Sequence, residues 1–415
     1  MSTHDLFEQR KNFFLAPSQL VRGGLFLALV LGATLLGMGF MHDPVRAWGA
    51  YLFNLFFFFT IALGGVVLCG MQDIVGAIWG RPVRRIHEAF SSFLPLAGVL
   101  FVVFFACIYL NVGGAGQVYK WIADPKIIEN LPGKRQWLQM VPMLARDTFA
   151  IILIVALALW QMRLGLNRDK AFVDGHHAES LELGKAVRSK LQYWSAPILV
   201  CYAITFSMLG FDLMMSLSPK WSSTLFGGWL FAIMMQTTFA TLLLTMFGLK
   251  SSALGQVVGQ QQFHDVGKLM HGFTIFFAYL TYAHVLTYWY GNMPEETEYY
   301  MHRMHAPWLY LIIGAPLLNF VLPLFAMIPK ASKWTATIAV PIGLLILFGQ
   351  WVVYLIVVTP EIVEAHDFHF PWVELGGFCG MLALFGICAL TFAKRNPMLP
   401  FADPLLADAL RGGQH

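Results

Sequence analysis

Ten long apolar runs are the feature of this sequence that most restricts its fold. Each can cross a bilayer as a helix, which takes about 20 residues at a rise of about 1.5 Å per residue. Only 12% of the 415 residues are charged, about half the share found in soluble domains. The sequence therefore predicts an all-α polytopic membrane protein. The expected spans are Arg22–Met41, Ala50–Trp79, Ala89–Asn111, Val141–Met162, Ser195–Leu217, Leu225–Leu249, Val266–Tyr290, Pro307–Ile328, Trp334–Val358 and Trp372–Ala393.

The basic residues predict how these spans are oriented. Ten spans place both ends of the chain on the same side, and 19 of the 27 Lys and Arg residues fall on that side. Because basic residues concentrate in cytoplasmic loops, we expect both termini in the cytoplasm. We expect no cleavable signal peptide, because the polar stretch Met1–Gln19 leads into a full span.

Three segments outside the spans are long. Val112–Met140 and Arg163–Trp194 are predicted to be loops, the second partly helical around Glu179–Lys190. The tail from Asn396 is punctuated by prolines and is expected to be extended. Solvated loops and docking surfaces for other subunits are both consistent with these segments.

Motifs of soluble enzymes are absent from the sequence. We find no nucleotide-binding loop, no HExxH and no nucleophile elbow. The five cysteines lie in apolar runs and form neither CxxC nor CxxCH, which argues against attached haem c and cysteine-ligated clusters. We therefore expect no catalytic residue, no metal site and no nucleic-acid partner.

The seventh span carries a polar stripe. On a helix, its polar positions fall within a sector of roughly 140°. Helix–helix hydrogen bonding, a proton-conducting or quinone-side path and a haem site would each explain the stripe. A two-haem site needs a matching histidine pair on a second helix, and the other histidines lie in tails or loops. The stripe comprises His271, Thr274, Ala278, Thr281, His284 and Tyr288.

Other ionisable residues also lie in or near spans. A charge at the middle of a bilayer costs about 2.5–3.5 kcal/mol, so such residues usually face a protein interior or a water cavity. Simple snorkelling is the alternative for His87, Glu88, His264 and Asp265. Toward the predicted cytoplasmic side lie Asp73, His87, Glu88, His264, Asp265, Lys268 and His271. Toward the other side lie Asp147, Asp212, His284 and Glu374.

Several stretches carry a family resemblance, and together they cover most of the chain. The sequence resembles the shorter of the two ten-helix membrane subunits of alternative complex III, a bacterial quinol:cytochrome c (electron acceptor) oxidoreductase. That subunit, named quinone-binding subunit 2, is related to polysulfide-reductase-type (NrfD-like) membrane anchors. The stretches are Tyr51–Gly65, Arg81–Phe90, Trp194–Pro197, Phe211–Gly227, Asp265–Lys268 and Trp289–Thr297.

The resemblance implies an architecture within a single membrane domain, residues 1–415. It implies two inverted four-helix bundles, over residues 50–217 and 225–358. Spans 22–41 and 372–393 would be peripheral, and residues 394–415 would be a cytoplasmic tail. The protein would lie in a bacterial inner membrane.

The resemblance also implies partners and a role. The partners would be a longer quinol-binding paralogue, an iron–sulfur subunit, and multihaem and monohaem cytochrome c subunits. Haem c and iron–sulfur clusters would belong to these partners, and whether quinol or menaquinol contacts this chain stays open. The chain would carry proton half-channels coupled to quinol oxidation. The inner path would comprise Asp73, His87, Glu88, Asp265, Lys268 and His271, and the outer path Asp147, Asp212, His284 and Glu374.

Two other functions remain open from the sequence. One is a menaquinol-linked NrfD-type anchor for a molybdenum or iron–sulfur reductase. The other is a self-sufficient secondary transporter, which an inverted repeat would also allow. Co-purifying subunits discriminate among the three.

Overall fold

A computed structural model describes residues 10–129, 131–174, 177–368 and 370–412, and these form helices without any strand. Ten helical segments are long and apolar enough to cross a membrane, which confirms the predicted all-α polytopic fold. The segments are Gln19–His42 (α2), Pro44–Ile74 (α3), Arg84–Tyr109 (α4 and α5), Met140–Val173 (α9), Glu182–Leu217 (most of α10, with η3), Phe226–Gly248 (α11), Gln260–Gly291 (α13), Trp308–Ala326 (α15, η4 and α16), Ala336–Ile362 (α17) and Trp372–Arg395 (α18).

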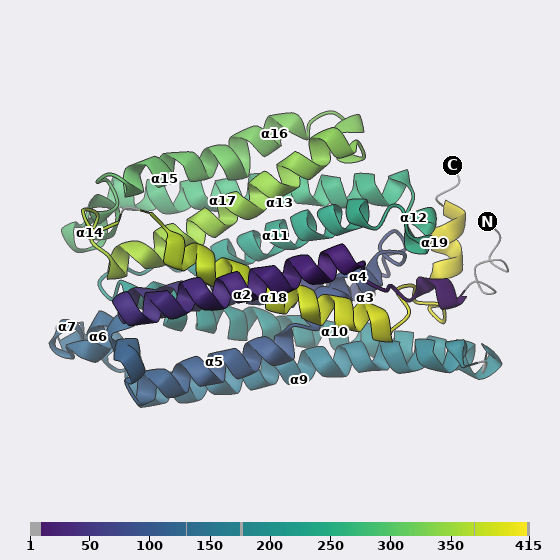
Figure 1. The fold of residues 1–415 in the computed structure, drawn as a ribbon, viewed down its shortest axis with the longest axis horizontal. Coiled ribbons are helices and arrows are strands. Elements are labelled where there is room, and N and C mark those ends of the chain that lie inside the picture. Colours follow the sequence, from purple (N-terminus) through teal and green to yellow (C-terminus); the bar gives the residue numbers. More distant parts are fainter. Residues whose placement is uncertain (1–9, 130, 175–176, 369, 413–415) are drawn as a thin grey trace.

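Short helices connect and flank these spans. Both η1 and α19 lie at the same end of the molecule as α4 and α12, which we call the terminal end (Figure 1). The loops with α6, α7 and α14 lie at the opposite end. The short elements are η1 (Arg10–Phe13), η2 (Val112–Val118), α6 (Lys120–Ala123), α7 (Lys126–Glu129), α8 (Pro132–Arg135), α12 (Ala253–Val257), α14 (Pro294–His302), η5 (Ala331–Lys333) and α19 (Leu406–Gly412).

Helix α3 forms the centre of the fold. Its apolar run is hydrophobic all round and is buried over the whole spanning window, as expected for a helix enclosed by other helices. It packs against α2, α4, α10, α11, α17 and α18. Phe56 stacks on Phe206 of α10 (His177–Leu213), and Phe53 contacts Trp351 of α17.

Eight of the ten spans, α3 included, form two groups of four. The first group contains α3, α4 with α5, α9 and α10, and the second contains α11, α13, α15 with α16, and α17. The division of the chain into two four-helix bundles, over residues 50–217 and 225–358, stays a prediction. Their inverted relation and the cytoplasmic position of the termini stay predictions.

Helices α2 and α18 pack against each other outside the two groups. A Cβ atom on Gly32 would lie 2.3 Å from the backbone nitrogen of Gly380 and 2.9 Å from the carbonyl oxygen of Gly376. Small residues let the two backbones approach this closely, which is a common way for membrane helices to associate.

Two predicted loops are more ordered than the sequence indicated. The expected loop Arg163–Trp194 is mostly helix, because α9 continues to Val173 and α10 begins at His177. The extension is rich in Lys, Arg, Glu and Leu, which are good helix formers. The segment 112–140 is folded into η2 and three short helices.

The solvated alternative for the tail is wrong, although residues 396–405 contain no helix. Met398, Leu399, Phe401 and Ala402 are all buried. Phe401 stacks on Phe172 of α9, and α19 follows it. Prolines in the sequence indicate that this segment is not a regular helix, but they do not indicate whether it is buried against the rest of the protein.

Candidate functional site

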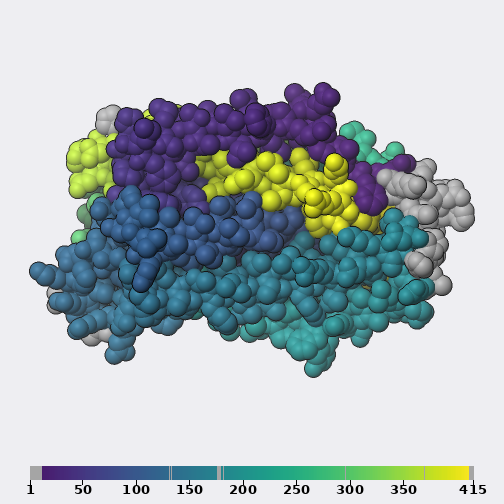
Figure 2. Space-filling model, turned by 60° about the horizontal axis from the view of Figure 1, so that its bottom comes forward, coloured from purple at the N-terminus to yellow at the C-terminus, as the bar shows by residue number. Residues whose placement is uncertain are grey.

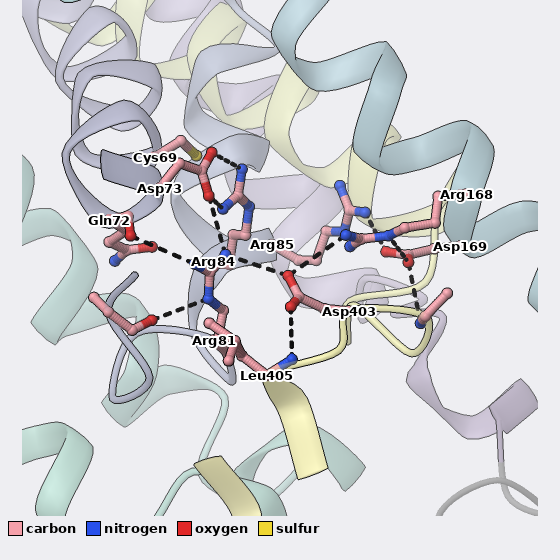
Figure 3. A network of polar contacts seen from close by, with 12 residues as sticks. Cys69, Gln72, Asp73, Arg81, Arg84, Arg85, Arg168, Asp169, Asp403 and Leu405 are labelled. Carbon is pink, nitrogen blue, oxygen red and sulfur yellow. Dashed lines mark hydrogen bonds and ion pairs between the residues drawn. The ribbon is translucent and has the colours of Figure 1, made fainter. Parts of the chain in front are cut away.

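A network of buried ions lies at the terminal end of the first group (Figure 3). It joins the end of α3, the turn before α4, the end of α9 and the C-terminal segment. Four positive and four negative side chains balance in charge, and each is at most 6% exposed. We call this set the arginine network. It comprises Arg81, Arg84, Arg85, Arg168, Asp73, Glu88, Asp169 and Asp403.

One half of the arginine network centres on Asp73. Arg84 Nη2 donates to Asp73 Oδ2 at 2.8 Å, and Arg81 Nη1 donates to Asp73 Oδ1 at 3.1 Å. Arg84 Nε also donates to Glu88 Oε1 at 2.9 Å, one helical turn away. Asp73 therefore fixes two guanidinium groups against the end of α3.

The other half centres on Arg85, whose side chain is fully buried. Arg85 forms ion pairs with both Glu88 and Asp169. Arg168 Nε donates to Asp169 Oδ1 at 2.9 Å. These contacts connect α4 to α9, so the ions hold the two helices together.

Asp403 brings the C-terminal segment into the network. Its Oδ2 lies 3.2 Å from Arg81 Nη1 and 3.5 Å from Arg168 Nη1. Its Oδ1 accepts from the backbone N–H of Leu405 at 3.0 Å. Burial alone would raise the pKa of this carboxyl, but the positive charges of Arg168 and Arg81 outweigh it and lower the pKa to about 2.

Cys69 and His87 lie beside the network. His87 Nδ1 is 3.3 Å from Cys69 Sγ and 3.1 Å from the carbonyl oxygen of Gly65. Cys69 Sγ is 3.7 Å from Glu88 Oε1. His87 Nε2 is buried and has no hydrogen-bond partner among the described residues. This nitrogen is therefore a buried polar atom whose hydrogen-bonding capacity is not used by the described residues.

A second polar site lies at the opposite end of the first group. Asp212 accepts from Arg146 Nε at 2.6 Å, from Arg146 Nη2 at 2.8 Å and from Trp137 Nε1 at 2.6 Å. Asp147 is its neighbour, and both carboxyl groups are fully buried. Burial and these two carboxyl groups raise the pKa of Tyr119, whose hydroxyl donates to the Leu213 carbonyl at 3.1 Å.

Asp147 differs from Asp212 in its partners. Neither oxygen of Asp147 receives a hydrogen bond from the part of the chain that the structure describes. A buried carboxylate without a donor is very costly. A proton on Asp147 removes its charge and lets it donate to Asp212, so this pair can hold a proton.

The second group has an uncharged polar cluster in its interior, which we call the amide cluster. Gln236 Nε2 donates to Thr274 Oγ1 at 3.0 Å and to the carbonyl oxygen of Asn319 at 2.9 Å. Gln350 Nε2 donates to Gln236 Oε1. All four residues are fully buried. The chain bends around them through η4 (Leu317–Val321), a π-helical turn.

His284 of the polar stripe faces a pocket of about 260 Å³ in the second group. Its Nδ1–H donates to the Leu280 carbonyl at 2.9 Å, which leaves Nε2 as a buried acceptor without a donor in the described structure. The rings of Trp221 and Trp229 lie beside it. Trp229 Nε1 donates to Thr281 Oγ1 at 2.9 Å, so part of the stripe forms helix–helix hydrogen bonds.

The remaining predicted site residues lie apart from these sites. Asp265 and Lys268 lie on α13 and line an open groove with Met71 and Trp79, and neither forms an ion pair with a described member of the arginine network. His271 is on the same helix, and its Nδ1 is buried without a partner in the described part. Glu374 pairs with Arg46 through two 2.9 Å contacts, which connect α18 to α3.

The structure therefore brings together Asp73, His87 and Glu88 in one place, and Asp147 and Asp212 in another. The snorkelling interpretation is wrong for His87 and Glu88, which are buried at 0% and 2% exposure. His264 and Asp265 are about 20% exposed and remain consistent with it.

Sequence reasoning missed many of the residues that complete these sites. Three arginines within five residues directly before an apolar span were a visible signal for part of the network. A glutamine or asparagine inside an apolar run was a signal for the amide cluster. The missed residues are Arg81, Arg84, Arg85, Arg168, Asp169, Asp403, Arg146, Gln236, Asn319 and Gln350.

The fold and these sites define a multi-pass helical membrane protein with buried polar networks. No group of three or more His, Cys, Asp or Glu side chains in the described ranges could hold a metal ion. No known family model matches the sequence, and no curated protein is significantly similar to it.

Proposed function

We propose that this chain is a membrane subunit of a bacterial quinol:cytochrome c (electron acceptor) oxidoreductase of the alternative complex III type. It scaffolds the subunits that carry haem c and iron–sulfur clusters and provides proton half-channels coupled to quinol oxidation. It sits in the bacterial inner membrane with both termini in the cytoplasm. The resemblance of its sequence stretches supports this family, and the geometry of α9 supports the protonic role.

The observation that carries the protonic role is the arrangement along α9. Asp147 lies near one end of this helix and Asp169 near the other, about 33 Å apart by helix rise. From Asp147 to Ala158 the buried face of α9 is apolar and includes Ile151 and Ile154, and the buried polar residue Gln161 follows before the inner site. Two buried polar sites separated by a dry section are what two half-channels require, because a continuous polar path would leak protons.

The outer and inner sites would handle a proton in different ways. At the outer site, Asp147 can take up a proton and share it with Asp212, while Arg146 is 20% exposed and connects the pair to the surface. At the inner site, His87 lies beside the arginine network, and its Nε2 is buried without a hydrogen-bond partner among the described residues. The network balances its own charge, so a proton that reaches His87 enters a neutral environment.

The test is Asp147→Asn in the intact complex reconstituted into vesicles. We expect normal assembly and normal electron transfer, with fewer protons released per electron, because an amide cannot take up and release the proton. Asp124→Asn is the matched control, since Asp124 is an exposed carboxylate at the same end. An unchanged proton-to-electron ratio in Asp147→Asn would refute the relay.

Asp212 is a poorer target for this test. Its carboxylate accepts three hydrogen bonds from Arg146 and Trp137, so Asp212→Asn removes structural contacts together with the charge. We therefore expect Asp212→Asn to lower the stability of the protein.

The subunits that co-purify with the chain test the family. A multihaem cytochrome c in the gently solubilised complex supports the proposal. A molybdopterin subunit in its place supports the NrfD-type anchor. A chain that is stable alone and binds a solute supports a transporter.

A further inference from the structure

A groove runs between α2 and α18 at the terminal end of the molecule. These two helices lie side by side on the face shown in Figure 2, α2 in purple and α18 in yellow. The groove has a volume of about 320 Å³. Arg22 and Lys394 lie at its terminal end, and Leu25, Leu29 and Leu390 continue it toward the middle of the span.

The charges of this groove are all of one sign. Arg22 and Lys394 are both exposed, and neither forms an ion pair with any residue that the structure describes. No carboxylate is among the described side chains that line the groove. Two cations that have no counter-ion among the described residues, at the end of two membrane-spanning helices, form a site for an anionic group.

The apolar part of the groove continues directly from its basic end. Residues 22 to 29 cover about 10 Å of helix, from the end of the span into its apolar section. Gly386 leaves room for Leu25, since a Cβ there would lie 2.8 Å from Leu25 Cδ2. A ligand that fits must carry a negative headgroup and a long apolar chain in this order.

We propose that the groove binds one anionic phospholipid, with its phosphate between Arg22 and Lys394 and an acyl chain along Leu25, Leu29 and Leu390. The bilayer supplies this ligand at high concentration. A free phosphate is also an anion, but it has no acyl chain to contact the leucines. The site is separate from the arginine network and independent of the proposed protonic role.

The experiment uses the full chain with its partner subunits, in nanodiscs of equal phosphatidylglycerol and phosphatidylcholine. After extraction into mild detergent, native mass spectrometry counts the retained lipids. We expect the wild type to retain phosphatidylglycerol in preference to phosphatidylcholine. Arg22→Gln and Lys394→Gln should each reduce this preference by about fivefold, because each removes one basic contact with the headgroup.

Arg395→Gln is the matched control. It removes the same charge from the next residue, which is also exposed but does not line the groove. We expect it to leave the lipid preference unchanged. If Arg395→Gln reduces the preference as much as Lys394→Gln does, general surface charge explains the binding and the proposal is wrong.

A second variant tests the apolar half. Leu29→Trp fills the groove without changing its charge, and we expect it to reduce retention of the lipid while the melting temperature is preserved. Inorganic phosphate at millimolar concentration should not displace the lipid. Displacement by phosphate, equal retention of the two lipids by the wild type, or a partner subunit cross-linked into the groove would each overturn the proposal.

Discussion

The two four-helix groups bury polar residues in different ways. The first group places charged side chains at its ends, in the arginine network and at the Asp147–Asp212 pair, with apolar residues between them. The second group also has a largely buried ion pair at one end, Arg303–Glu361, but it places uncharged amides in its interior, in the cluster around Gln236. The difference follows from cost, since a charge is most expensive far from water, whereas neutral amides can satisfy one another there.

This comparison also separates two kinds of stabilisation. The first group depends on charge balance, because the removal of one ion leaves another buried without compensation. The second group depends on matched donors and acceptors. The predictions below test this distinction, beginning with the largest expected effect.

Arg85→Ala should destabilise the protein most. It leaves the buried carboxylates of Glu88 and Asp169 without their shared partner, which costs about 3–5 kcal/mol. The midpoint of denaturant-induced unfolding in detergent measures the effect. Lys185→Gln is the control, because the Lys185–Glu182 pair is exposed and should contribute nothing measurable. Equal midpoints for the two variants would contradict the role of charge balance.

Gln350→Leu should have a smaller effect, about 1–3 kcal/mol, because it leaves the buried Gln236 Oε1 without its donor. The same unfolding measurement applies. Since the penalty comes from an unmatched partner, Gln350→Leu together with Gln236→Leu should cost less than the sum of the two single changes. Strict additivity would show that the two side chains do not act as a pair.

The lowered pKa of Asp403 predicts that the packing of the C-terminal segment depends on pH. The pKa of Asp403 is lowered from 3.8 to about 2 in the folded protein. The ionised carboxylate of Asp403 therefore stabilises the folded protein by about 2 kcal/mol above about pH 4. This stabilisation is lost as the pH falls from about 4 to 2.

Protease cleavage of the C-terminal segment as the pH is lowered measures this loss. Asp403→Asn should raise cleavage at neutral pH and remove the dependence between pH 4 and 2. Asp408→Asn, an exposed carboxylate in the same segment, should behave as the wild type. An unaltered acid dependence in Asp403→Asn would assign it to another group.

Asp265→Asn should have the smallest effect, within about 0.5 kcal/mol, because the Asp265 side chain is about 21% exposed and its polar partners among the described residues are its helical neighbours Gln261 and His264. The same unfolding midpoint measures it. A loss comparable to that of Arg85→Ala would place Asp265 in a buried network and remove the contrast between α13 and the first group.

The candidate sites were only partly predictable. Asp73, His87, Glu88, Asp147 and Asp212 stood out because ionisable residues near apolar spans are costly. The sequence did not show which of them meet, since Asp265 and Lys268 were expected at the same depth as Asp73 but lie on α13 and form no ion pair with the described residues of the arginine network. Asp403 was missed because its tail resembles a solvated segment in composition, and only its packing against α9 brings it to Arg81 and Arg168.

The sequence by itself determined the number of spans, their helical state and the presence of polar residues within them. These follow from the length of each apolar run, because a bilayer forces backbone groups to bond within their own helix. Only the tertiary structure decided which polar residues meet. Arg85 and Asp169 are 84 positions apart, and Arg81 and Asp403 are 322 apart. Contacts of this kind depend on how helices pack, and no local pattern along the chain records that packing.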